Sequence, residues 1–157
     1  MLSVEQHHPE EYPFRMEFGT PNLPGIAGLH AGVKWVLSRG MGAIHDGELM
    51  LWKLLRDGLR GIDGVTLYCA DGAEDRLGVL AFNVDGVTAS QVGAILDVDH
   101  DIAARTGLHC APLVHESLGT IANEGAVRFS LGPFNTQEEV QMAIAAVTRI
   151  ARQHRSR

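Results

Sequence analysis

Residues 77–96 read LGVLAFNVDGVTASQVGAIL and contain a strand, a turn and the start of a helix in one continuous stretch. Leu77–Val84 is an apolar run of strand length, and the Asp-Gly pair that follows it is a typical turn. Thr88 is a good N-cap because its hydroxyl can accept a first-turn amide, which predicts a helix over Ala89–Leu96. A strand that leads directly into a helix places this stretch at the centre of a fold with both kinds of element.

Further elements are predicted on both sides of this centre. Apolar residues spaced by three and four predict helices, and short apolar runs between turn residues predict strands. Thr136, with Glu139 three residues later, forms a capping box that begins the last helix. The predicted helices span Gly25–Arg39, Ala43–Leu59 and 137–153, and the predicted strands span Val65–Cys69, Ile102–Ala104 and Val127–Leu131. This order predicts a small α+β domain within the broad α/β class: a mainly antiparallel sheet with helices packed on one face.

The first part of the chain differs from the rest. Its prolines, among them Pro13 and Pro24, interrupt any regular element. We therefore predict an extended connecting arm over residues 1–24, of the kind that joins two parts of a longer protein. Residues 25–157 are predicted to form a single domain.

The composition is that of an ordinary folded domain. Hydrophobic residues make up 45% of the 157 residues, and the formal net charge is -6. This acidic balance argues against nucleic-acid binding, which needs a clustered basic face. No stretch approaches the roughly 20 apolar residues of a membrane span, and the polar start lacks the apolar core of a signal peptide. These features predict a cytoplasmic protein, in which Cys69 and Cys110 would be free thiols.

The segment that best suits chemistry is RTGLHCAPL, residues 105–113. A predicted strand delivers the chain into a loop that holds Cys110, with Arg105 and His109 before it and Pro112 after it. Nearby positive charge lowers the pKa of a thiol, and an exposed thiolate is a good nucleophile. The alternative is a buried, inert cysteine, which is the usual state of a free cysteine.

Arg128 is the second candidate. It lies inside the apolar strand VRFSL, residues 127–131, where a charge is costly unless it finds a partner. A guanidinium there can offer a two-pronged donor to a carboxylate. The alternative is an outward-facing strand residue, because Val127 and Phe129 would then point inward.

Several motifs, taken in order, resemble a known family. They are RTGLHCAPL itself, GAVRFSLG at residues 125–132, FNTQEE at residues 134–139, and upstream EFGTPN at residues 17–22 and GIAGL at residues 25–29. Together they closely resemble the C-terminal domain of cysteine desulfurases, which are pyridoxal-phosphate enzymes of the class V aminotransferase family. The resemblance runs from about Phe14 to Ile150, and it implies the small C-terminal domain of the fold-type I enzymes that use this cofactor.

The resemblance implies an activity and a role for particular residues. A cysteine desulfurase removes sulfur from L-cysteine, leaves alanine and holds the sulfur as a persulfide, with pyridoxal phosphate as the electron sink. Selenocysteine lyases are relatives, so the family alone does not choose between cysteine and selenocysteine. The matching positions are Cys110 as the attacking thiol, Arg128 as the clamp for the substrate carboxylate, Arg105 and His109 in the active-site loop, and Gly19 with Thr20 at the cofactor phosphate of the neighbouring subunit.

Two details separate this chain from other patterns. Many members of the family have a histidine where this chain has Leu108, and branches without that histidine exist, so Leu108 indicates a subgroup. A metal centre made of Cys110, His109 and His115 would match no standard zinc spacing, and no metal site is predicted.

The chain offers no plausible lysine for the cofactor. Lys34 and Lys53 are its only lysines, and both fall in predicted amphipathic helices instead of the His-Lys loop that the family uses. The resemblance therefore implies that the cofactor lysine belongs to a separate N-terminal half. Three readings follow: a working C-terminal half of a desulfurase, an inactive truncated fragment, or a cofactor-free persulfide carrier. The implied partners are that N-terminal half or a homodimer partner, the amino-acid substrate and a sulfur-acceptor protein.

Overall fold

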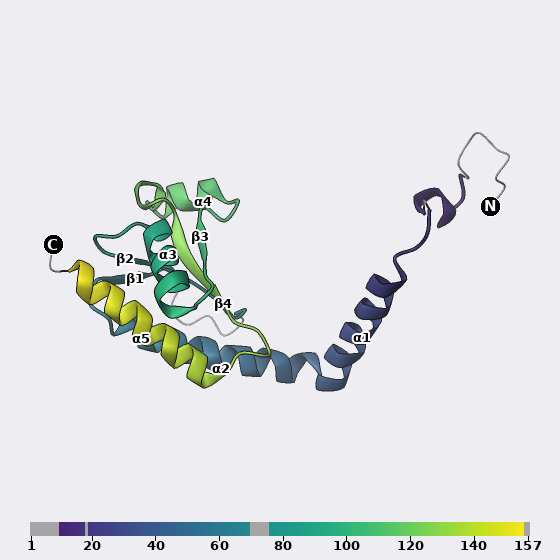
Figure 1. Ribbon diagram of the computed structural model, residues 1–157, viewed down its shortest axis with the longest axis horizontal. Coiled ribbons are helices and arrows are strands. Elements are labelled where there is room, and N and C mark those ends of the chain that lie inside the picture. The colour runs from purple at the N-terminus through teal and green to yellow at the C-terminus, as the bar shows by residue number, and fades with distance from the viewer. Residues whose placement is uncertain (1–9, 18, 70–75, 156–157) are drawn as a thin grey trace. The chain divides into compact units, whose positions relative to one another are not determined.

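The computed structural model describes residues 10–17, 19–69 and 76–155. The chain divides into two compact units, Met1–Met41 and Gly42–Arg157, and Figure 1 labels the helices and strands of each. Residues 1–9 of the predicted arm lie outside the described residues. The predicted boundary near residue 24 stays a prediction, because it concerns how this chain joins a longer protein.

The first unit contains a 3-10 turn, η1 (Phe14–Met16), and one helix, α1 (Leu23–Arg39). The helix begins two residues before its predicted start because the side chain of Asn22 accepts a hydrogen bond from the Gly25 amide at 3.0 Å. It ends at Gly40, where a positive φ of 82° suits glycine. Its apolar stripe is exposed at Ile26, Leu29, Val33 and Leu37.

The second unit contains a four-stranded sheet in the order β1-β2-β4-β3. The strands are β1 (Val65–Leu67), β2 (Val79–Val84), β3 (Arg105–Gly107) and β4 (Ala126–Ser130). Each neighbouring pair is antiparallel. In the central pair Leu80 faces Phe129 and Phe82 faces Val127, so the large apolar side chains of both strands share one face.

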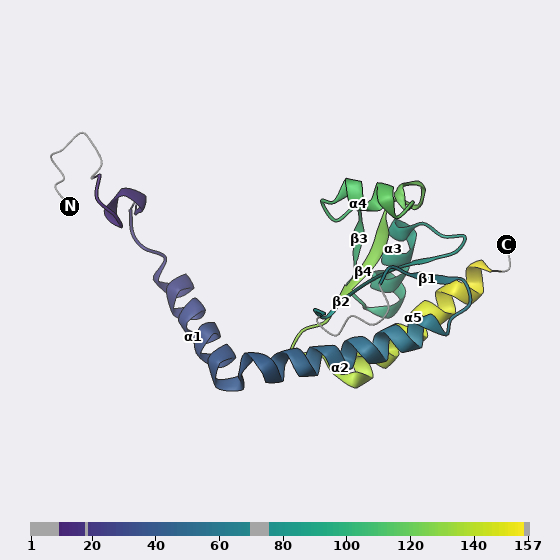
Figure 2. The ribbon, with the colours of Figure 1, turned by 180° about the vertical axis from the view of Figure 1, so that it is seen from behind.

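Three helices cover that apolar face: α2 (Met41–Arg60), α3 (Ala89–His100) and α5 (Gln137–His154). Helices α2 and α5 run side by side, as both views show (Figures 1 and 2). The Phe82 and Phe129 rings lie 5.2 Å apart at the centre, and burial of each such side chain contributes about 1.5–3 kcal/mol. The largest side chains that are fully buried are Trp52, Phe82, Leu55, Leu59, Leu80, Leu96, Ile150, Val92, Val127, Val140 and Val147. The predicted antiparallel sheet with helices on one face is confirmed.

The predicted strand at Ile102–Ala104 is wrong in position. Helix α3 continues to His100, and Asp101 ends it in the left-handed conformation with its amide bonded to the turn before. The chain therefore becomes a strand only at Arg105–Gly107, where it pairs with β4. Residues 102–104 lie between the end of α3 and β3 without regular secondary structure.

The segment predicted as a loop after Cys110 contains a short helix, α4 (Pro112–Ser117), and a 3-10 turn, η2 (Ile121–Asn123). Pro112 begins this helix instead of ending a loop. A proline is tolerated in the first turn because the amide of a first-turn residue has no acceptor within the helix. The helix matters for the site because it follows the cysteine directly.

Candidate active site at the Cys110 turn

The sheet has a second face, opposite the helices. Alternate residues of a strand point to opposite faces, and the buried Val127 and Phe129 of β4 belong to the core. Arg128 therefore lies on the opposite face. It is the direct partner of Ala81 on one side and of Arg105 on the other. Two arginines on neighbouring strands thus project from the same face.

Arg128 is half-buried, and its Nε atom is buried without a hydrogen-bond partner in the part of the chain that the structure describes. A buried donor without an acceptor costs about 1–3 kcal/mol. The Arg128 side chain faces outward, away from the helices, as the alternative prediction stated. This buried donor without a partner distinguishes Arg128 from an ordinary solvated arginine. A carboxylate placed beside Arg128 could accept its hydrogen bond.

Cys110 lies at a turn with an unusual backbone. His109 and Cys110 both have positive φ, 52° and 59°, a conformation that costs a non-glycine residue about 1–2 kcal/mol. The Ala111 amide donates to the Leu108 carbonyl at 2.8 Å and closes the turn. Cys110 is exposed, so the alternative that it is buried is wrong. We call residues Leu108–Ala111 the Cys110 turn.

Helix α4 carries one buried residue, His115, which is 4% exposed. Its Nδ1 lies 2.7 Å from the hydroxyl of Thr120, which is also buried. The His115 ring lies 5.5 Å from the ring of His109, at an angle of 48°. Helix α4, which follows Cys110, therefore packs through His115 against His109.

His109 is half-buried beside the His115 ring. Neither of its ring nitrogens has a hydrogen-bond partner with good geometry among the described residues. Burial lowers the pKa of His109 below its ordinary value, and the positive charge of Arg128 lowers that pKa further. The backbone of Ala126 opposes this shift only in part. Burial and the nearby charges therefore favour the neutral form of His109, and the charge of Arg128 acts on this residue of the Cys110 turn.

Gly125 fixes the path of the chain beneath the turn. It has a φ of 93°, and a Cβ there would overlap the Gly107 carbonyl and the Leu108 amide. The side chain of the buried Asn83 donates to the Gly125 carbonyl at 2.9 Å. Only a glycine allows this close approach, because any side chain would push the two segments apart.

Sequence reasoning missed three contributors to this arrangement: His115 as a packing group, Thr120 and Asn83. His115 had been considered only as a metal ligand. One signal was available, since Asn83 is a polar residue inside the apolar run Leu77–Val84, and a buried amide needs a specific partner.

The structure brings together four predicted site residues: Cys110, His109, Arg105 and Arg128. The charges of Arg105 and Arg128 both act on His109, which precedes the cysteine. Gly19 and Thr20 lie in the first unit, where both are exposed. Their place beside a cofactor phosphate stays a prediction.

The two lysines lie on helix surfaces. Lys34 is exposed on α1, and Lys53 is exposed on α2 between buried neighbours that face the core. Helix α2 covers the apolar face of the sheet, whereas Arg128 lies on the opposite face. Lys53 is therefore not positioned to reach the Cys110 turn.

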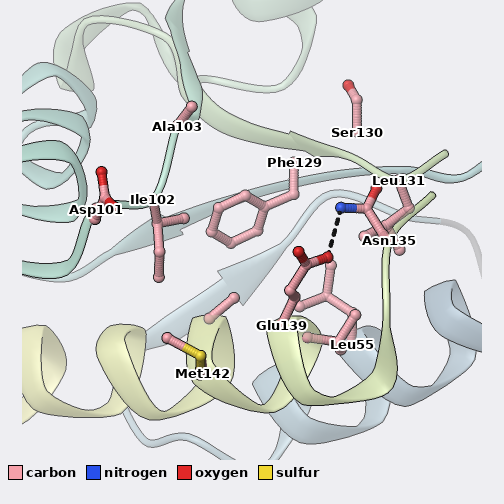
Figure 3. A pocket seen from close by; sticks show the side chains of 12 residues that line it. Leu55, Asp101, Ile102, Ala103, Phe129, Ser130, Leu131, Asn135, Glu139 and Met142 are labelled. Carbon is pink, nitrogen blue, oxygen red and sulfur yellow. Dashed lines mark hydrogen bonds between the residues drawn. The ribbon is translucent and has the colours of Figure 1, made fainter.

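A cavity of about 460 Å³ lies on the helix side of the sheet, apart from the Cys110 turn (Figure 3). The Phe129 ring points into it, while Ser130 points away. Glu139 lies at its edge and accepts a hydrogen bond from Asn135 at 3.0 Å. None of the predicted site residues lines this cavity, so its size does not mark the thiol site.

Two kinds of feature are not found within the described ranges. No group of three His, Cys, Asp or Glu side chains there is arranged to hold a metal ion. None of the helices described is both long and apolar enough to cross a membrane.

Comparison with known proteins agrees with this fold. The family model described as "Aminotransferase class-V" matches residues 1–142. The chain therefore belongs to the class V aminotransferase family, and the predicted resemblance is confirmed.

Similar proteins within this family are cysteine desulfurases. A cysteine desulfurase of Salmonella agona strain SL483 is 43% identical over 140 residues, which cover 89% of this chain and 33% of the relative. The apo structure of a cysteine desulfurase from Thermococcus onnurineus NA1 has a TM-score of 0.80 and 37% identity, and the match covers 90% of this chain and 34% of that one. The cysteine desulfurase CsdA of Escherichia coli, in an S-sulfonic acid form, has a TM-score of 0.72 and 29% identity, with 90% and 34% covered. The chain spans about a third of the length of these relatives.

Proposed function

We propose that this chain is the C-terminal part of a cysteine desulfurase, in which Cys110 takes the sulfur atom of L-cysteine and holds it as a persulfide. One observation carries the proposal. An exposed thiol lies on a strained turn, directly after a half-buried histidine whose pKa is lowered by burial and by the charges of Arg128 and Arg105 on the open face of the sheet. A thiolate near cationic groups is a nucleophile, and its exposure lets a substrate sulfur approach.

The arginines supply the binding part of the proposal. Arg128 has an unsatisfied donor that suits the carboxylate of an amino acid, and Arg105 adds a second positive charge across the strand pair. A carboxylate held there would fix the orientation of the amino acid relative to Cys110. His109, on which both charges act, directly precedes the thiol in the chain.

Sulfur transfer needs a defined exchange of bonds. The Cys110 thiolate forms an S–S bond with the substrate sulfur, the C–S bond of the substrate breaks, and the carbon takes up a proton to give alanine. The electron pair left on carbon needs a sink, which is the chemistry that pyridoxal phosphate supplies in this family. The residues of this chain do not fit that cofactor alone, since Lys34 and Lys53 lie exposed on helices and Lys53 belongs to a helix on the opposite side of the sheet.

The partners follow from this incomplete fit. We propose that the cofactor lysine comes from an N-terminal half, and that residues 1–24 are the arm that connects or docks to it. In the homodimer that the family forms, Gly19 and Thr20 would reach the cofactor phosphate of the neighbouring subunit. A sulfur-acceptor protein would then remove the persulfide. We place the protein in the cytoplasm, where reducing conditions keep Cys110 a free thiol.

A second candidate is a persulfide carrier that needs no cofactor. The exposed Cys110, together with the position of Lys53 on a helix at the opposite face of the sheet, favours this function. A carrier would receive sulfur from a separate persulfide donor and would release no alanine. The third reading, an inactive fragment, differs from both because Cys110 would take no sulfur from any donor.

Alanine release from L-cysteine separates these functions. The purified chain is mixed with pyridoxal phosphate, first alone and then with the separately produced N-terminal half of a related cysteine desulfurase. The proposal predicts alanine only with the added half, and none when Cys110→Ala replaces the wild type. Cys69→Ala is the matched control and should retain activity. Selenocysteine in place of cysteine, followed by the same alanine assay, compares the two substrates.

Two results would contradict the proposal. Alanine from the chain alone would mean that Lys34 or Lys53 serves the cofactor after all. No alanine with the added half, together with sulfur transfer to Cys110 from a persulfide donor, would favour the carrier instead.

A further inference from the structure

We infer that His115 and Thr120 are positioning residues that hold the Cys110 turn in its strained conformation and fix it beside Arg128. The inference deepens the proposed function, since it concerns the turn that carries the proposed sulfur acceptor. Neither residue needs to touch the substrate for this role.

The turn needs an external support. Two successive residues, His109 and Cys110, are held at positive φ without glycine at either position. Such a conformation persists only where the surrounding structure enforces it. One local hydrogen bond, from the Ala111 amide to the Leu108 carbonyl, is not enough to offset a strain of about 2–4 kcal/mol over two residues.

Helix α4 provides that support through a single side chain. The helix has six residues, and His115 is its one buried member. The His115 amide bonds to the Ala111 carbonyl at 3.3 Å, so its backbone is tied to the end of the turn. Its ring packs against the ring of His109 at 5.5 Å. The imidazole of His115 is therefore the contact through which α4 holds the turn.

The hydroxyl of Thr120 determines how that ring is oriented. It lies 2.7 Å from His115 Nδ1 and 3.3 Å from the His115 carbonyl oxygen. The short contact is satisfied in either of two ways: Nδ1–H donates to the hydroxyl, or the hydroxyl donates to an unprotonated Nδ1. In both cases the bond holds the ring in one orientation and one tautomer.

The same threonine connects the turn to the strand that carries Arg128. The Thr120 amide donates to the His115 carbonyl at 2.9 Å, and the Gly125 amide donates to the Thr120 carbonyl at 2.9 Å. Gly125 directly precedes β4. A continuous series of contacts therefore runs from the turn through His115 and Thr120 to β4.

The test measures how fast iodoacetamide alkylates Cys110 in the full chain, with Cys69 in the same molecule as the internal control. Thr120→Val keeps the shape of the side chain but removes the hydroxyl. We expect the released turn to change the alkylation rate of Cys110 by about threefold or more, because the position and exposure of the thiol depend on the turn. Cys69 should react at the wild-type rate. Thr120→Ser restores the hydroxyl and should restore the Cys110 rate, a rescue that general loss of packing would not show.

An unchanged Cys110 rate in Thr120→Val, with Cys69 also unchanged, would overturn the inference. If Thr120→Val unfolds, both cysteines react faster, and the decision passes to a measurement on the wild type. Nitrogen chemical shifts of the His115 ring should then show one fixed tautomer at neutral pH, whereas a mixture of both tautomers would contradict the inference. Alkylation and ring shifts need no cofactor or substrate, so their outcome is independent of whether alanine is released.

Discussion

Arg105 and Arg128 are direct partners across the antiparallel β3–β4 pair, so two cationic side chains extend from one face of the sheet. Like charges opposite each other on neighbouring strands destabilise a sheet. The arrangement is therefore costly in isolation and favourable once an anion binds between or beside them. The charges of both arginines lower the pKa of His109, which belongs to the Cys110 turn. This relationship supports the proposed role of the two arginines in binding a carboxylate near the Cys110 turn.

The first prediction concerns the geometry of Arg128. Arg128→Lys keeps the charge but loses the planar fork that holds a carboxylate with two hydrogen bonds. In the enzyme completed with an N-terminal half, we expect kcat/KM for L-cysteine to fall by about ten- to a hundredfold, since a hydrogen bond to a charged group contributes about 1.5–3 kcal/mol. The matched control is Arg149→Lys on the exposed surface of α5. An unchanged kcat/KM in Arg128→Lys would rule out the carboxylate clamp.

The second prediction concerns the close approach at Gly125. Gly125→Ala adds a Cβ that overlaps the backbone of Gly107 and Leu108, at a residue with positive φ. Backbone strain of about 1–2 kcal/mol and overpacking of about 1–3 kcal/mol predict a combined loss of about 2–5 kcal/mol in the free energy of unfolding. Urea unfolding measures it. Gly119→Ala, where φ is also positive but no atom lies within 4 Å, should lose only the strain. Equal losses in the two variants would mean that the approach is not tight.

The third prediction concerns pH. The pKa of His109 is lowered from 6.5, first by burial and then by Arg128. Because the unfolded chain then binds more protons, the stability contributed by neutral His109 is full above pH 6.5, falls as the pH drops below that value, and is lost once the pH has passed the folded pKa.

His109→Asn should remove this part of the pH dependence, which urea unfolding at several pH values between about 5 and 8 would record. His30→Asn, at an exposed position on α1, is the control and should leave the slope unchanged. A wild-type slope in His109→Asn would show that the histidine is not buried in its neutral form.

The fourth prediction tests the core beneath the site. Phe82 is fully buried and packs against Phe129. Phe82→Ala should lower the free energy of unfolding by about 3–5 kcal/mol, through lost burial and the cavity left behind. Val98→Ala, on the exposed side of α3, should stay within about 0.5 kcal/mol of the wild type. A loss below about 1 kcal/mol for Phe82→Ala would place the core elsewhere.

The sequence predicted most of the fold because hydrophobic period and capping residues are local signals. Thr88 and Thr136 form capping boxes with the glutamine or glutamate three residues later, at the predicted helix starts. Helix α4 escaped prediction because six residues are too few to show a helical period. Strand β3 escaped because Arg105–Gly107 has no apolar alternation and becomes a strand only by pairing with β4.

The proposed chemistry of the site could be predicted in part, because it too rests on local sequence signals. Cys110, His109 and Arg128 stand in motifs whose residue types already indicate thiol and carboxylate chemistry. His115 and Thr120 are ordinary polar residues in the sequence, and only folding buries them together. A contact of this kind depends on the path of the backbone between the two residues, which no pattern of residue types specifies.

The most direct test of the central claim is the mass of the peptide that contains Cys110, measured after the chain reacts with L-cysteine, pyridoxal phosphate and an N-terminal desulfurase half. The account predicts a gain of one sulfur atom on Cys110, reversed by a reducing thiol, with the Cys69 peptide unchanged. Release of alanine while Cys110 stays unmodified, and continued release by Cys110→Ala, would contradict the claim that this thiol accepts the sulfur.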